Sequence, residues 1–275
     1  MSDWTGKHVV VTGGSSGIGL ATAELFAAKG ADVTLIARDV ERLLAAQQAV
    51  AARRMSTRAS ISAVSGDVST LASCEAIVGK ATVAGARPID VLVSCAGIII
   101  PGYFEKMTPA DFEACMDSWR GCVYMARAAA PAMMKRGSGH IVNVSSVAGF
   151  MGIFGYTAYS SAKYAVMGFS EALRSEMYPH GVKVSVVCPP DTDTPGLAFE
   201  KSLRPAETDK VAGNIAAVPP TAIATAIVRG VERGKYLIVP GVLSQFYRVL
   251  KANAQWLFFM ITDGDVAAAR KARGL

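Results

Sequence analysis

A strand, a glycine-rich turn and a helix follow one another near the start of the chain, and this stretch limits the possible folds more than any other. The valine-rich run His8–Thr12 leads into the sequence Thr12-Gly-Gly-Ser-Ser-Gly-Ile-Gly19, and an apolar helical pattern covers Ile18–Lys29. Glycine lets a ligand approach the backbone closely, and the free N–H groups and dipole of a helix N-terminus attract an anion. In this context the motif predicts a cradle for the pyrophosphate of a dinucleotide, with a tight turn that binds nothing as the plain alternative. The residues expected to form the cradle are Thr12, Gly13, Ser15, Ser16, Gly17, Ile18 and Gly19.

Strand and helix patterns alternate along the rest of the chain. The expected strands are Asp32–Ala37, Ser60–Val64, Pro88–Gly97, Ile141–Val144 and Val182–Cys188. A long helix is expected over Thr108–Met134, with Thr108 as N-cap and Pro109 at its first position, and another from near Tyr159 to Tyr178. Such alternation predicts an α/β fold, a Rossmann-like doubly wound parallel sheet flanked by helices in a single domain. The 275 residues, 51% of them hydrophobic, suffice for one large core.

The end of the second expected strand indicates which dinucleotide would bind. A carboxylate at this place usually binds the ribose 2′-hydroxyl of NAD, whereas a basic side chain suits the 2′-phosphate of NADP. Here Ala37 is followed by Arg38, and Arg42 comes one helical turn later. We therefore expect NADPH/NADP as the cofactor, although the two arginines are also compatible with solvated charges at a helix start. Asp67 and Val68, which follow the third strand, are expected near the adenine.

A tyrosine and a lysine four residues apart form a candidate catalytic pair. Tyr159 and Lys163 stand at the start of a helical pattern, so their side chains share one face. An ammonium beside a phenol favours the phenolate, and we expect it to lower the pKa of the tyrosine from about 10 toward working pH. Tyr159 is thus a candidate proton donor and acceptor, and Ser146, which follows the strand His140–Val144, is placed to bond the same substrate oxygen.

Four motifs, in this order, resemble those of the classical short-chain dehydrogenase/reductase family: Thr12–Gly19, Ser94-Cys-Ala-Gly97, Asn143-Val-Ser-Ser146 and Tyr159-Ser-Ser-Ala-Lys163. The resemblance covers about Gly6 to Gly241, which suggests a Rossmann domain over residues 1–241 and a C-terminal extension over residues 242–275. It implies that Tyr159 protonates a carbonyl oxygen during hydride transfer, that Ser146 polarises it, and that Lys163 holds the nicotinamide ribose. Members of the family commonly form dimers or tetramers, so a homo-oligomer is expected. The cofactor contacts that the resemblance implies are Ser94, Ala96, Gly97, Tyr159, Lys163, Pro189, Thr192 and Thr194.

Three positions depart from the pattern of this family. Counting back from Gly121, Ser118 replaces an asparagine that anchors a proton-relay water, so Ser118 is included among the catalytic candidates. Ser94 replaces the first asparagine of Asn-Asn-Ala-Gly, and Pro190 replaces the glycine of a Pro-Gly pair. The first two changes leave open a weakly catalytic dinucleotide-binding sensor or scaffold.

The loop after the sixth strand points to a substrate. Its sequence Cys-Pro-Pro-Asp-Thr-Asp-Thr-Pro-Gly196, together with Phe-Gly-Tyr-Thr-Ala-Tyr159 and a downstream Arg-Pro-Ala-Glu-Thr, is similar to 3-ketodihydrosphingosine reductases. Those enzymes reduce a long-chain 3-keto amine with NADPH in sphingolipid synthesis, which is therefore the implied reaction. Asp191 or Asp193 would pair with the substrate ammonium, unless both only cap a turn. Reduction of another apolar carbonyl, such as a 3-oxoacyl thioester or a steroid, is the alternative.

Apolar and aromatic residues crowd the segment Leu237–Ile261, with Arg248 and Lys251 between them. This composition suits an interfacial helix or a lipid-entry lid, and a helix packed on the core or on another subunit is equally compatible. The polar end, Asp263–Leu275, is expected to fray.

Charge and cysteine usage exclude other classes of function. The net charge of +6 fits phosphorylated cofactors or anionic lipid, and without a basic run we do not expect a nucleic-acid partner. The five cysteines contain no C-x-x-C pair, so neither a metal site nor a disulfide framework is expected. We expect a cytoplasmic protein, with association at a membrane surface left open.

Overall fold

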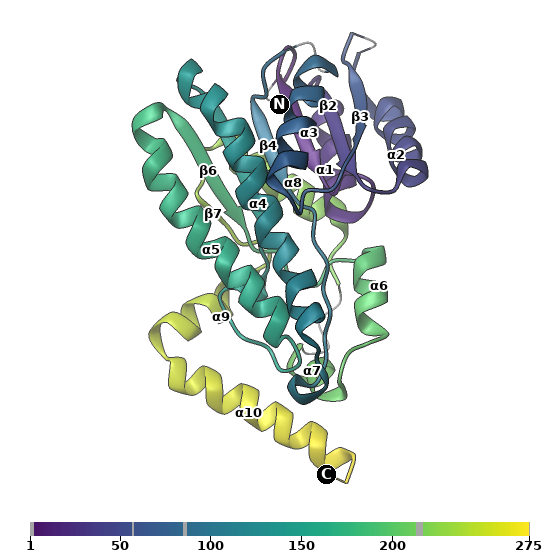
Figure 1. Ribbon diagram of the computed structural model, residues 1–275. Helices are drawn as coiled ribbons and strands as arrows, with labels where there is room; N and C mark the ends of the chain where they lie inside the picture. Colours follow the sequence, from purple (N-terminus) through teal and green to yellow (C-terminus); the bar gives the residue numbers. More distant parts are fainter. Residues whose placement is uncertain (1–2, 57, 85–86, 213–216, 275) are drawn as a thin grey trace.

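The computed structural model describes residues 3–56, 58–84, 87–212 and 217–274, and a parallel sheet forms its centre (Figure 1). Within these residues the sheet has seven strands in the order β3-β2-β1-β4-β5-β6-β7, and every neighbouring pair is parallel. The Rossmann-like fold predicted from the sequence is confirmed. The strands are β1 His8–Thr12, β2 Asp32–Ala37, β3 Ile61–Ser65, β4 Val91–Ser94, β5 Gly139–Val144, β6 Val182–Val187 and β7 Leu237–Ile238.

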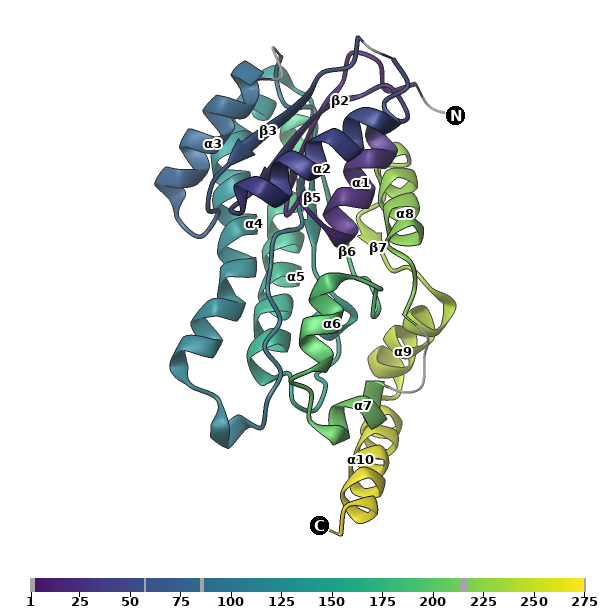
Figure 2. The same cartoon turned by 90° about the vertical axis from the view of Figure 1, so that its right-hand side faces the viewer.

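Helices cover both faces of the sheet, because successive strand side chains point to opposite sides (Figure 2). Val9 and Val11 of β1 pack with α1, α2 and α8, whereas Val10 between them packs with α3, α4 and α5. The helices are α1 Gly17–Ala27, α2 Val40–Arg53, α3 Leu71–Ala84, α4 Pro109–Arg136, α5 Thr157–Met177, α6 Pro195–Lys201, α7 Ala206–Ala212, α8 Pro220–Glu232, α9 Val242–Asn253 and α10 Gln255–Ala272, with 3-10 turns at Phe104–Lys106, Val147–Gly149 and Tyr178–His180.

The long helix α4 begins and ends where the sequence predicts. The Thr108 side chain accepts a hydrogen bond from the N–H of Asp111, the Asp111 carboxylate accepts one from the N–H of Thr108, and Pro109 opens the helix. The helix ends at Gly137, whose φ of 69° is the left-handed conformation that glycine adopts without strain. These caps fix α4 beside α5, which carries the candidate catalytic pair.

Strand order changes direction between β1 and β4, which are neighbours although two strands and three helices separate them in the chain. Thr12 at the end of β1 stands opposite Ser94 at the end of β4. Ligands of doubly wound folds bind outside the carboxyl ends of strands at such a switch point. The fold therefore places a crevice beside the glycine turn.

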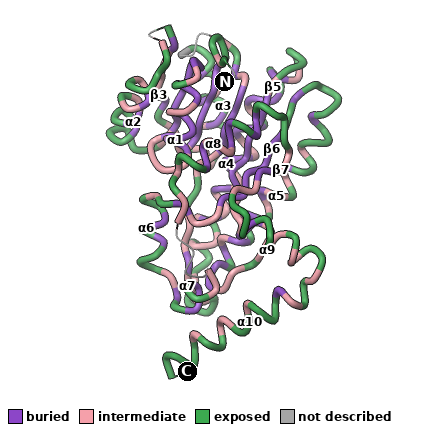
Figure 3. The backbone as a smooth tube through the Cα atoms, turned by 180° about the vertical axis from the view of Figure 1, so that it is seen from behind, coloured by how far each residue is buried: buried purple, intermediate pink, exposed green. Residues whose placement is uncertain are grey.

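The C-terminal residues form two further helices, α9 and α10, and α10 extends along the edge of the molecule with much of its surface exposed (Figure 3). The expectation that residues from Asp263 onward fray is wrong, since α10 is continuous to Ala272; Leu275 lies outside the described residues. Arg270 and Arg273 hold this end, because their guanidinium groups lie 4.0 and 3.7 Å from the buried Glu207 carboxylate of α7. Among the helices described here, none is both long and apolar enough to cross a membrane.

Candidate active site

A cavity of about 540 Å³ opens at the carboxyl ends of the strands. Its walls come from the glycine turn, the ends of β2 and β4, the start of α5, and the loop from β6 into α6. Segments that are distant in the sequence therefore meet around one space, as the switch point requires.

The glycines of the turn allow neighbouring backbone segments to approach one another closely. Gly13 has a φ of 67°, and a Cβ added there would lie 2.9 Å from the backbone nitrogen of Ala96. A Cβ at Gly19 would overlap the carbonyl oxygen of Gly13. Ser16 is the N-cap of α1, yet its side chain caps no N–H group of the described residues, so the first turn keeps its donors for a ligand. This turn and its free donors fit a pyrophosphate.

Two predicted cofactor residues support the turn instead of lining the cavity. Thr12 is buried, and its Oγ1 accepts hydrogen bonds from the N–H groups of Cys95 and Ala96, at 3.1 and 3.2 Å. Ser94 is also buried, and its hydroxyl has no hydrogen-bond partner among the described residues. Ala96 and Gly97, which follow Ser94 in the chain, line the cavity as predicted.

The adenosine end of the cavity is basic. Arg38 and Arg42 both line it, and Arg38 is exposed. Asp39, which follows Arg38 on the cavity wall, caps α2 by accepting a hydrogen bond from the N–H of Arg42 at 3.0 Å. Asp67 and Val68 line the same end, as expected.

The three predicted catalytic side chains lie together on the cavity wall. Ser146 follows β5 and Tyr159 and Lys163 stand on α5, so the strand–helix packing sets their spacing. The buried Lys163 Nζ donates a hydrogen bond to the carbonyl oxygen of Val144 at 3.0 Å and lies 5.5 Å from the centre of the Tyr159 ring. The structure thus brings the three residues together as the sequence predicts.

The phenol of Tyr159 is in its neutral form. Burial raises the pKa of Tyr159 above its ordinary value, a hydrogen bond from the Ser146 hydroxyl lowers it, and the charge of Glu200 raises it further. Burial also lowers the pKa of Lys163. The expectation that Lys163 brings the pKa of Tyr159 toward neutrality is therefore wrong for this structure, because desolvation, the largest cause, raises this pKa. A protonated phenol is the form that donates a proton to a carbonyl oxygen.

Ser118, the replacement for the asparagine of the family, lies behind the catalytic lysine. It is buried on α4, and within the described part of the chain its hydroxyl has no hydrogen-bond partner. A Cβ added to Gly97 would lie 2.7 Å from Ser118 Oγ and 3.6 Å from Lys163 Nζ. A small polar side chain therefore faces the same narrow gap as the lysine.

The loop after β6 brings only part of its predicted set to the cavity. Pro189, Thr192 and Thr194 line it, and Thr194 caps α6 by accepting a hydrogen bond from the N–H of Leu197 at 3.1 Å. Asp191 also lines the cavity, whereas Asp193 is exposed and is not part of the wall. Of the two aspartates predicted to bind the substrate, Asp191 lies on the cavity wall and Asp193 does not.

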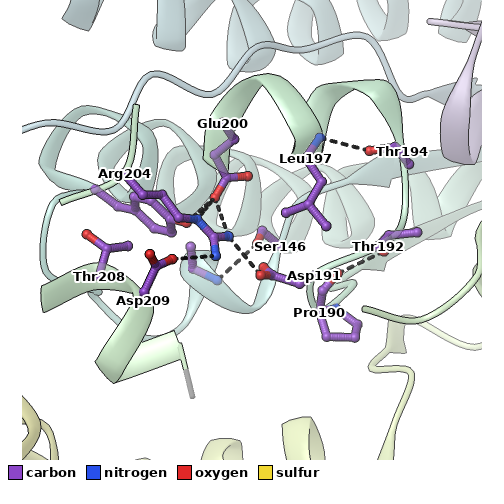
Figure 4. Close-up of polar contacts among 12 residues, drawn as sticks. Ser146, Pro190, Asp191, Thr192, Thr194, Leu197, Glu200, Arg204, Thr208 and Asp209 are labelled. Atoms are coloured by element: carbon purple, nitrogen blue, oxygen red, sulfur yellow. Dashed lines mark hydrogen bonds and ion pairs between the residues drawn. The ribbon is translucent and has the colours of Figure 1, made fainter. Parts of the chain in front are cut away.

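The sequence motifs did not predict a cluster of charged side chains around Arg204, at the wall of the cavity (Figure 4). Arg204 Nη2 lies 2.7 Å from Asp191 Oδ2, and Arg204 Nε donates to Glu200 Oε1 at 2.6 Å. The Tyr156 hydroxyl also donates to Glu200 Oε1. A signal was available, because Glu200 and Arg204 are an i, i+4 pair of opposite charges that follows the loop. In the described ranges no group of His, Cys, Asp and Glu could hold a metal ion.

Comparison with known proteins agrees with the fold. The model of the short chain dehydrogenase family matches residues 7–204, and the chain belongs to this family. The Bos taurus protein named 3-ketodihydrosphingosine reductase is 41% identical over 232 residues, which is 84% of this chain and 70% of that protein. A Dictyostelium discoideum protein of the same name is 36% identical over 274 residues, covering 94% of this chain and 81% of that protein.

Solved structures of this family have the same architecture. A short-chain dehydrogenase from Sphingobium yanoikuyae in complex with NADPH superposes with a TM-score of 0.75 at 28% identity, covering 91% of this chain and 94% of its own. Levodione reductase superposes with a TM-score of 0.80 at 28% identity, covering 88% of this chain and 99% of its own. The protein is thus an oxidoreductase that acts between C=O and CH–OH with a nicotinamide dinucleotide.

Proposed function

We propose that this chain reduces 3-ketodihydrosphingosine to dihydrosphingosine with NADPH. The observation that carries the proposal is the group of Ser146, Tyr159 and Lys163 on one cavity wall, in a chain 41% identical to the cattle reductase over 232 residues. Arg38 and Arg42 at the adenosine end support NADPH over NADH, because guanidinium groups pair with a 2′-phosphate.

Each catalytic residue has a chemical task in this reaction. NADPH, when bound, supplies the hydride that adds to C3 of the ketone. The Tyr159 phenol donates its proton to the carbonyl oxygen, so that a secondary alcohol forms, and the Ser146 hydroxyl donates a hydrogen bond to the same oxygen. Lys163 would hold the ribose hydroxyls, and its buried ammonium stabilises the phenolate left after proton transfer.

The assay that tests this proposal is loss of nicotinamide absorbance with the purified chain, NADPH and a panel of ketones. The highest kcat/KM should belong to 3-ketodihydrosphingosine, above 3-oxoacyl thioesters and steroids. Tyr159→Phe should keep NADPH binding and lose about 10²–10⁴-fold in turnover, because only the acid is removed. Full activity of that variant would remove Tyr159 from the mechanism, and NADPH binding without turnover of any ketone would favour a sensor or scaffold.

We also propose that residues 242–262 contact a membrane surface from which a lipid substrate enters. Large apolar side chains on α9 and α10 are exposed, with Val242 at 87% and Trp256 at 71%. The Lys251 Nζ is engaged within the molecule, where it donates a hydrogen bond to the carbonyl oxygen of Phe150 at 2.8 Å. The proposed membrane contact is therefore supported by the exposed apolar area of α9 and α10 rather than by basic charge.

Sedimentation with zwitterionic vesicles tests this contact. The wild type should sediment with the vesicles, and Trp256→Ser should bind them less at equal folded content. If the same face joins two copies of the chain, analytical ultracentrifugation without vesicles will show a homo-oligomer that the Trp256→Ser substitution weakens.

A further inference from the structure

Three carboxylates surround one buried guanidinium next to the catalytic tyrosine (Figure 4). The Arg204 side chain is only 3% exposed. Its nitrogens lie 2.7 Å from Asp191 Oδ2, 2.6 Å from Glu200 Oε1 and 3.5 Å from Asp209 Oδ1. Asp209 is mostly exposed, so the inner part of the cluster consists of one cation and two anions.

This inner part carries one excess negative charge. Asp191 and Glu200 each contribute a carboxylate, and Arg204 neutralises one of them. Glu200 is buried, and burial raises the pKa of its carboxyl, so its charged form is costly unless a further cationic partner is available. The cluster therefore favours a cation on its open side.

The open side of the cluster faces the catalytic cavity. Asp191 and Glu200 line this cavity, whereas Arg204 lies behind them and lines a separate cavity of about 300 Å³. The Tyr156 ring is the link to the catalytic centre, because Arg204 Cζ lies 5.8 Å from its centre and the Tyr159 ring packs edge-to-face at 5.7 Å.

One oxygen of Glu200 is free for a ligand. Both Tyr156 and Arg204 bond to Oε1, while Oε2 receives no hydrogen bond from any described residue, although the side chain is only 7% exposed. Figure 4 shows this second oxygen pointing away from Arg204. An unpaired carboxylate oxygen on the cavity wall, carried by a largely buried side chain, is a strong acceptor for a charged donor.

We infer that Asp191 and Glu200 bind the ammonium group at C2 of the substrate, and that Arg204 is a positioning residue that fixes both carboxylates. The inference rests on the proposed reduction of 3-ketodihydrosphingosine. In that substrate the ammonium is on the carbon next to the carbonyl, so a ketone at Tyr159 brings the ammonium within reach of the neighbouring wall. Ketones that lack the amine leave the excess charge unpaired and bind less well.

A matched pair of substrates tests this without any mutation. The first is 3-ketodihydrosphingosine, and the second is the ketone of the same chain length with hydrogen in place of the C2 amine. The wild type should prefer the amine by at least about tenfold in kcat/KM, which is about 1.4 kcal/mol. Equal kcat/KM for the two overturns the amine site and leaves a ketone reductase, whereas turnover of neither ketone overturns the proposed function as well.

Substitutions then locate the site on the protein. Glu200→Gln and Asp191→Asn should each lose about tenfold more kcat/KM with the amino ketone than with the amine-free ketone. Most of that loss should appear in KM, because the ammonium is already charged in the ground state. Arg204→Lys keeps the charge but loses the two-pronged contact, and it should reduce the same preference.

Asp193→Asn is the matched control, since it makes the same chemical change two residues from Asp191 at an exposed position off the cavity wall. Its preference for the amine should equal that of the wild type. Thermal unfolding and NADPH affinity show whether each variant is folded. A preference that stays at the wild-type value in folded Glu200→Gln and Asp191→Asn, or that falls in Asp193→Asn alone, overturns the assignment.

Discussion

Arg38→Asp should move the cofactor preference from NADPH toward NADH. Arg38 and Arg42 line the adenosine end of the cavity, and Asp39 between them is occupied in capping α2. The wild type therefore offers two guanidinium groups at this place, which suits a 2′-phosphate. The substitution removes one donor for the phosphate and supplies a carboxylate for a ribose hydroxyl.

The size of the effect follows from the exposure of Arg38. A hydrogen bond to a charged group contributes about 1.5–3 kcal/mol, and solvent and salt screening favour the lower value for an exposed side chain. That lower value corresponds to a factor of about ten, so the ratio of kcat/KM for NADPH to kcat/KM for NADH should fall at least about tenfold. The added like-charge repulsion toward the phosphate increases the change further.

Steady-state kinetics with both cofactors at one fixed ketone concentration measure this ratio. Arg53→Asp, which makes the same charge change on the last turn of α2 away from the cavity wall, is the control and should leave the ratio unchanged. The difference should also shrink as salt is added, because the pairing is exposed. If Arg38→Asp and Arg42→Ala both keep the wild-type ratio, the two arginines do not contact the 2′-phosphate.

Three further substitutions test other parts of the structure. Ser118→Ala should lower kcat more than the KM for NADPH if its hydroxyl serves the proton path beside the lysine, and equal kcat in the variant would remove it from that path. Burial, and then the charge of Lys183, lower the pKa of His140 to about 4, so the folded state stays unprotonated while the unfolded state takes up a proton below its ordinary pKa of 6.5. The free energy of unfolding, measured with denaturant, should therefore fall by about 2 kcal/mol from pH 7 to about pH 5. His140→Gln should lose most of this pH dependence. Glu207→Gln weakens the contacts to Tyr103 and Arg273 and should cost about 1–3 kcal/mol of unfolding free energy, whereas the exposed Glu105→Gln should cost almost nothing.

Local patterns were enough to predict most of the sheet and the catalytic set. The run His8–Thr12 and the strand Asp32–Ala37 match β1 and β2 at both ends, because each is a buried strand followed by a strong turn or cap signal. Tyr159 and Lys163 could be paired because helix geometry alone puts residues four apart on one face. Ser146 joined them because parallel strands end at a common edge.

Features that depend on tertiary packing were not predictable in the same way. The two-residue strand β7 carries too short a pattern to be recognised, and its pairing with β6 defines it. The choice between Asp191 and Asp193 depends on which side of an irregular loop faces the cavity, and no periodicity decides that. The helix α10 continues through a polar segment because Glu207, far away in the sequence, accepts its arginines.

The wrong expectation for the pKa of Tyr159 also arises from tertiary packing. The groups that raise this pKa connect the catalytic residue to the inferred amine site. A lysine at i+4 was expected to control the pKa of the phenol, but desolvation dominates, and the charges of Glu200 and Asp191 add to the rise in the pKa of Tyr159. An ammonium bound to these two carboxylates would offset their charge and so make the phenol a stronger acid. A substrate with the amine would thus assist its own protonation, whereas a ketone without it would leave the phenol in its least acidic state. The same two carboxylates would then act in both binding and proton transfer.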